Sequence, residues 1–160
     1  MKGKIDSEKI ILRRIQMLQG GIRATKEFRK LNEKVESFDF SFKREFLFNP
    51  NEKLIVVELK IDLKALKSGK TKLVPAGLSA NYEYQFYFLI DNIGDFINDE
   101  NVHPSIVSTV LSIAYSTLRG IILERTSGTL LGSVILPIVN PAKLLSEGLS
   151  GNAERGQNTE

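Results

Sequence analysis

Three stretches of strict alternation between apolar and polar residues constrain the fold of this 160-residue chain more than any other feature. Alternate residues of a β-strand point to opposite faces of a sheet, so each stretch predicts a strand with one apolar face. The apolar positions are Phe38, Phe40, Phe42, Phe46 and Phe48, then Ile55, Val57, Leu59, Ile61, Leu63 and Ala65, then Leu78, Ala80, Tyr82, Tyr84, Phe86, Phe88 and Ile90. Because the turns Asn49-Pro50-Asn51 and Ser68-Gly69 separate them, we expect hairpins and an antiparallel sheet.

Residues 9–28 fit two different structures. Ile11, Ile15 and Leu18 have the spacing of one helical face, but Gly20-Gly21 would cost a helix about 2 kcal/mol. In a strand, the same glycine pair would indicate a bulge or a close approach of another backbone. The residue pattern leaves both structures open.

The pattern changes after His103 to apolar residues three and four apart, which predicts one long and largely buried helix. Pro104 suits its first turn, and Thr126-Ser127-Gly128 suits its end. An extended stretch then leads to Asn140-Pro141, which predicts a short helix through Leu149. We therefore expect a single domain over residues 1–149, followed by a polar, frayed tail over residues 150–160.

The composition argues against most kinds of catalytic centre. The chain has no cysteine, which excludes disulfides, cysteine-ligated metals and thiol catalysis. Its one histidine, His103, has no recognisable nucleophile as partner, and we expect it to cap the helix or lie at the surface. The acids between Asp91 and Glu100 lack the spacing of a calcium loop, and no glycine loop suits a phosphate. We expect no enzyme, no cofactor and no metal.

Charge and hydropathy bear on location and on partners. Residues 1–72 carry 18 Lys and Arg against 10 acids, and residues 73–160 carry 4 against 9. The basic residues are scattered along alternating strands, so nucleic-acid binding is not expected. The N-terminus lacks the apolar core of a signal peptide, and the uncharged stretch 102–118 is too short to span a membrane. These features predict a cytoplasmic protein without membrane insertion.

The order of elements resembles the SecB family of protein-export chaperones. Its C-terminal part carries the most specific motifs, which are Pro104 near the start of the long helix, the polar turn 126–129, Leu136-Pro137 and Val139-Asn140. The resemblance extends over residues 10–149 and implies that residues 10–28 form the first strand. The fold it implies is α+β, with a four-stranded antiparallel sheet followed by one long and one short helix.

The resemblance implies a chaperone that holds unfolded or nascent polypeptides without ATP, for export or for delivery to a partner. It also implies a homotetramer, built as a dimer of dimers with the long helices at its centre. The strand positions that would match the family's acidic contacts to the translocase motor SecA are Gly21, Thr25 and Asn81, and none is acidic. This departure argues against SecA as a partner and is closer to the SecB-like chaperones linked with toxin–antitoxin systems.

The resemblance places an apolar client-binding groove between the second strand and the last helix. Its lining residues would be Phe38, Phe40, Phe42, Leu136, Ile138, Leu144, Leu145 and Leu149. Two interpretations of these residues stay open, because an alternating aromatic face is normally buried and the same residues could be core. Two functions also stay open, a general holdase and a dedicated interaction module, such as a chaperone of one antitoxin or an adaptor for one partner.

Overall fold

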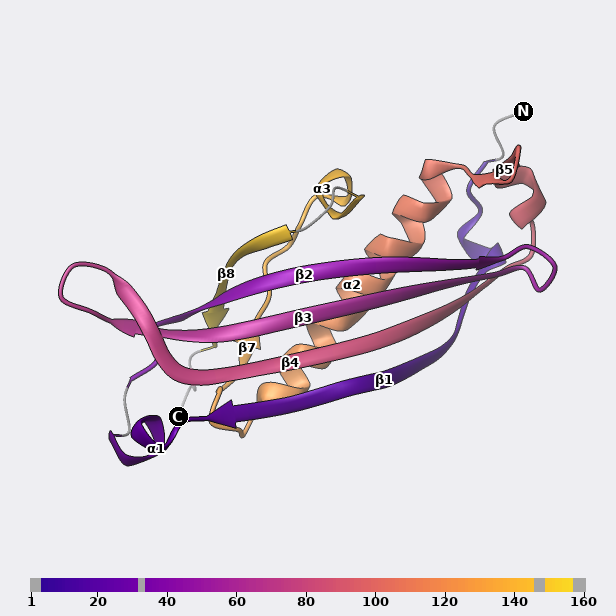
Figure 1. Ribbon diagram of the computed structural model, residues 1–160. Coiled ribbons are helices and arrows are strands. Elements are labelled where there is room, and N and C mark those ends of the chain that lie inside the picture. The colour runs from indigo at the N-terminus through magenta and orange to yellow at the C-terminus, as the bar shows by residue number, and fades with distance from the viewer. Residues whose placement is uncertain (1–3, 32–33, 146–148, 157–160) are drawn as a thin grey trace.

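The computed structural model describes residues 4–31, 34–145 and 149–156, and its fold is α+β. One antiparallel sheet curls along its length, and the long helix α2 lies across one face of it (Figure 1). The main elements are β1 (Ile10–Ala24), α1 (Lys26–Leu31), β2 (Ser37–Asn49), β3 (Leu54–Ser68), β4 (Leu73–Ile90), α2 (Pro104–Thr126), β7 (Val134–Ile135), α3 (Pro141–Leu145) and β8 (Leu149–Arg155). The short strands β5 (Ile97–Asn98) and β6 (Asn101–Val102) form a separate hairpin, and single 3₁₀ turns lie at Ser7–Lys9 and Ile93–Phe96.

The sheet has six strands in the order β1-β4-β3-β2-β8-β7, so the expected count of four is wrong. The four long strands are those expected, three from the alternation and β1 from the resemblance, and β8 and β7 extend the sheet beyond β2. Most of β8 falls in the segment expected to be a polar tail, and Leu149, expected to end the short helix, begins β8 instead. The alternation rule misses β8 because its sequence, LSGNAER, has only two apolar residues and pairs through its backbone.

The strand interpretation of residues 10–28 is confirmed for residues 10–24, where the helical alternative is wrong, but residues 26–28 belong to helix α1. β1 pairs with β4, with irregularities in register between Leu12 and Arg14 and between Met17 and Gln19. At Gly20, an added Cβ would lie 3.2 Å from Cδ1 of Tyr82 and 2.9 Å from Sδ of Met17. Side chains, not another backbone, therefore approach Gly20 closely, and the register irregularity between Met17 and Gln19 lies next to it.

The core lies between α2 and the apolar faces of β2, β3 and β4. Along β3 and β4, every residue of the two predicted apolar rows is buried, whereas Phe46 and Phe48 at the end of the β2 row are half-buried. The ring of Tyr115 from α2 meets that of Phe42 edge to face, with centroids 5.4 Å apart. Length and composition alone would let α2 span a membrane, but in this fold its apolar side packs on the sheet.

His103 begins α2 as its N-cap, which confirms the capping role expected for it. Its Nδ1 accepts a hydrogen bond of 3.2 Å from the backbone N–H of Ser105 and lies 2.7 Å from the Ser105 hydroxyl. Pro104 occupies the first turn, where its missing N–H costs nothing. The sole histidine is thus used by the helix terminus.

Candidate functional site

The strand side of the expected groove is buried. Phe38, Phe40 and Phe42 point from β2 toward α2, and none is more than 3% exposed. Strand β8 runs antiparallel along the outer edge of β2, where Phe38 pairs with Ala153 and Phe40 with Gly151. The chain's own C-terminal segment therefore covers the β2 edge on which the groove was expected.

The C-terminal side of the expected groove is held against α2. Leu136 and Leu144 are 1% and 2% exposed, and the segment around Leu136 is fixed by two bonds from α2. The Tyr115 hydroxyl donates to the carbonyl of Pro137 over 2.9 Å, and Nε of Arg119 donates to that of Leu136 over 3.0 Å. Burial of the Tyr115 ring raises the pKa of its hydroxyl to about 12, so the donor keeps its proton at any physiological pH.

Arg44 connects β2 to α3, and sequence reasoning missed it. Its Nε donates to the carbonyl of Leu144 over 2.6 Å, and its Nη2 donates to the carbonyl of Leu145. These are the last carbonyls of α3, which have no partner within so short a helix. A signal was present in the sequence, because Arg44 stands at an apolar position of the β2 alternation and faces the same side as the phenylalanines.

The structure brings most of the predicted groove residues together, but as core. Phe38, Phe40, Phe42, Leu136 and Leu144 belong to one buried cluster, and Leu145 packs against it half-buried. Ile138 stands apart on the surface at 85% exposure. The backbone of Leu149 begins β8, while its side chain lies outside the described residues. Their role as client contacts stays a prediction.

Apolar side chains are exposed along β1, which is the end strand of the sheet. The members of this β1 strip are 36–46% exposed: Ile11, Ile15, Met17, Leu18 and Ile22. On α2, Ile113 and Leu123 are also exposed, at 37% and 40%. An exposed apolar edge strand is a surface on which another polypeptide can pair.

The face of the sheet opposite α2 carries polar side chains and a hollow of about 750 Å³. Its charged and amide residues come from five adjacent strands: Arg23, Asp39, Asp62, Lys64, Asn81 and Asn152. Carboxylates and cations alternate there, and Asp39 lies directly opposite Lys64 in the register. This size and mixed polarity suit a peptide segment or a small polar molecule.

Three glutamates gather beyond this hollow on the same face. Glu45 lies opposite Glu58 in the register, and Gln85 donates from Nε2 to Oε2 of Glu58 over 3.0 Å. The pKa of Glu83 is raised, first by a hydrogen bond with the Glu58 carboxyl and then by desolvation and repulsion from Glu58. Within the described ranges, no group of His, Cys, Asp and Glu side chains has the geometry of a metal site.

The positions expected to bear on SecA are adjacent but not acidic. Gly21 of β1 pairs with Asn81 of β4, while Thr25 lies beyond β1 and accepts a bond from the N–H of Phe28. The three glutamates, Glu45, Glu58 and Glu83, lie farther along the sheet. There, Lys60 of β3 is opposite both Glu83 of β4 and Lys43 of β2. Cations therefore flank these carboxylates on the sheet.

Comparison with known proteins identifies the architecture. No protein-family model matches the chain, and no curated protein matches it in sequence. Among solved structures, the SecB-like chaperone Rv1957 of Mycobacterium tuberculosis, in complex with a ChAD peptide from the antitoxin HigA1 (Rv1956), matches with a TM-score of 0.59 at 17% identity. The match covers 84% of this chain and 93% of that one. The chain has the SecB-like fold.

This finding confirms, for the fold, the resemblance that the C-terminal motifs suggested. In the SecB-like fold of this chain, the Leu136-Pro137 step directly follows β7, and Asn140 caps α3 by accepting from the N–H of Ala142 over 2.9 Å. A protein of unknown function from Streptococcus agalactiae matches less well, with a TM-score of 0.34 at 14% identity over 81% of this chain and 97% of that one.

Proposed function

We propose that this protein is an ATP-independent chaperone that holds unfolded or nascent polypeptides by their apolar segments. The observation that carries the proposal is the SecB-like fold, which this chain shares with a chaperone solved with a bound peptide. Supporting features are the exposed β1 strip and the nearly fully exposed Ile138. Binding of this kind uses apolar area and backbone pairing and needs no catalytic group.

A dedicated interaction module is the second candidate, and the antitoxin peptide bound by Rv1957 favours it. Such a protein would hold one antitoxin or another single partner rather than many clients. Delivery to a folding or transport partner fits both candidates. SecA is not among the partners we propose, since Gly21, Thr25 and Asn81 offer it no carboxylate.

We further propose a homotetramer in the cytoplasm, assembled as a dimer of dimers. The β1 strip leaves one side of an apolar end strand uncovered, and α2 leaves Ile113 and Leu123 exposed. A second copy that pairs along β1, and a second dimer that packs on α2, would cover both surfaces.

The test is suppression of aggregation, followed by light scattering. Several unrelated proteins are unfolded chemically and diluted into buffer with stoichiometric amounts of this chain, and a non-chaperone protein of similar size serves as control. A general holdase lowers the scattering of most clients. Suppression of one partner alone would support the dedicated module, and failure with every client would overturn the holdase.

A further inference from the structure

Strand β8 occupies the one edge of β2 that does not pair with β3. Five residues of β2 pair with it, from Phe38 opposite Ala153 to Phe42 opposite Leu149. Ala153 is 1% exposed, so its side chain is buried in the core, and it lies opposite Phe38 in the strand register. The backbone groups of this β2 edge and the aromatic surface next to them are therefore covered by a segment of the same chain.

Two inward-facing residues of β8 whose side chains the structure describes, Gly151 and Ala153, are small. A Cβ added at Gly151 would lie 3.2 Å from Cε1 of Phe40, which is tighter than most contacts of real side chains. Ala153 contributes a single methyl group opposite Phe38. Burial of apolar area is what holds a strand beyond its backbone bonds, and Gly151 and Ala153 supply little of it opposite Phe40 and Phe38. An extended segment with larger apolar side chains would bury more, once Phe40 turned aside.

We propose that β8 is an internal occupant of the client site, and that an extended client segment displaces it and pairs with β2 in its place. The inference rests on the proposed function and names its mode of binding, which is strand addition. In the absence of client, β8 shields an aromatic strand edge that would otherwise promote aggregation.

The exposed face of the β2–β8 pair, which points away from α2, indicates which clients fit. Asn152 lies directly across from Asp39, beside the polar hollow that also contains Asp62. A client with Lys or Arg in the place of Asn152 would set a cation opposite the Asp39 carboxylate. The site thus suits an extended segment in which apolar residues alternate with polar or basic ones.

A reversible disulfide between β2 and β8, called the lock below, tests in the full-length protein whether a client displaces β8. The chain contains no cysteine, so the double variant Asp39→Cys/Asn152→Cys carries one engineered pair at directly opposed strand positions. Such positions lie within the reach of a disulfide. Affinity is measured by the fluorescence anisotropy of a labelled, reduced and alkylated protein that stays unfolded. We expect the oxidised form to bind at least tenfold more weakly than the same sample after reduction.

A second variant destabilises the pairing of β8 with the β2 edge. Ala153→Lys puts a charge at a buried position, and Asn152→Lys puts the same charge on the exposed face as the matched control. Ala153→Lys should bind the unfolded probe more tightly than wild type, and Asn152→Lys should bind it no more tightly. Circular dichroism checks that each variant is folded, and the lock decides the question if Ala153→Lys is not.

Two contrary outcomes are distinguishable. Equal, measurable affinity of the oxidised and reduced lock would overturn the displacement and leave the holdase intact. No binding by wild type, the reduced lock or Ala153→Lys would overturn the proposed function, and the displacement with it.

Discussion

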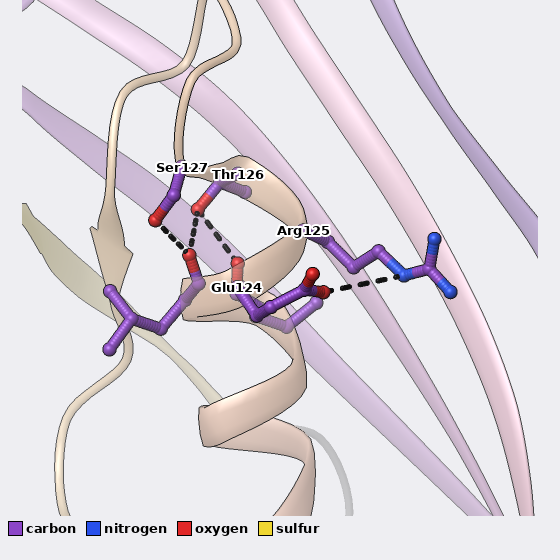
Figure 2. Close-up of polar contacts among 6 residues, drawn as sticks. Glu124, Arg125, Thr126 and Ser127 are labelled. Atoms are coloured by element: carbon purple, nitrogen blue, oxygen red, sulfur yellow. Dashed lines mark hydrogen bonds and ion pairs between the residues drawn. The ribbon is translucent and has the colours of Figure 1, made fainter.

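At the scale of single residues, Thr126 is the one fully buried polar side chain within the described ranges. Figure 2 shows its hydroxyl turned back onto the last turn of α2, where it donates to the carbonyl of Ile122 over 2.7 Å. The same oxygen accepts a bond of 2.9 Å from the N–H of Val134 in β7. One hydroxyl therefore ends the helix and fixes the start of the segment that returns to the sheet.

Replacing Thr126 with valine should destabilise the protein by about 1–3 kcal/mol, because the buried N–H of Val134 would lose its acceptor. Urea denaturation measures the change. The neighbouring Ser127→Ala is the matched control, since Ser127 is exposed although its hydroxyl also donates to Leu123. Equal losses for the two variants would contradict the role given to Thr126.

Ile138 separates client binding from stability better than the buried groove residues do. It is 85% exposed, so Ile138→Ser should leave the free energy of unfolding within about 0.5 kcal/mol of wild type. Affinity for an unfolded probe should fall severalfold if Ile138 contacts clients. Leu130→Ser, at another exposed position, should change neither quantity. Unchanged affinity in Ile138→Ser would remove this residue from the site.

At the scale of elements, the position of helix α3 depends on a residue of strand β2. It spans only five residues, too few to be stable alone, and the guanidinium of Arg44 bonds two of its carbonyls. This tie holds α3 next to the β2–β8 pair. Its position is therefore set by packing on α2 and by Arg44 of β2 rather than by helix propensity.

Arg44→Lys should loosen α3, because one ammonium cannot reproduce the two parallel bonds of a guanidinium. We expect faster amide exchange over residues 141–145 and a loss of about 1–3 kcal/mol in stability. Lys43→Gln, on the exposed face of the same strand, is the control. If α3 exchanges no faster in Arg44→Lys than in Lys43→Gln, the tie is not what positions it.

The sequence predicts the elements that bury a regular apolar face and misses those that do not. Alternation identifies β2, β3 and β4, and the period of α2 identifies the long helix. It cannot identify β8, in which the described residues opposite Phe38 and Phe40 are only Ala153 and Gly151. It also cannot assign β1, whose register is irregular, without the SecB-like resemblance. The groove residues were named from that resemblance. The burial of those on β2 depends on β8, which no local sequence pattern predicts.

At the scale of the whole molecule, the β1 strip should control assembly. Ile15 is 40% exposed on β1, and a charge there would oppose pairing with a second copy. Ile15→Lys should shift the protein toward smaller species in sedimentation velocity, while its circular dichroism stays native. Gln16→Lys, next to it in β1, should shift the species less. A wild-type protein that sediments as a monomer would contradict the proposed tetramer.

Hydrogen–deuterium exchange with and without a saturating unfolded client shows whether a client binds and whether it replaces β8 on β2, both in one measurement. Amides of residues 149–155 should exchange faster once client is bound, because β8 leaves the β2 edge. Amides of residues 38–42 should stay protected, because a client strand replaces β8 there. Exchange that is unchanged throughout the chain, or altered only far from β2, would contradict the proposed displacement of β8.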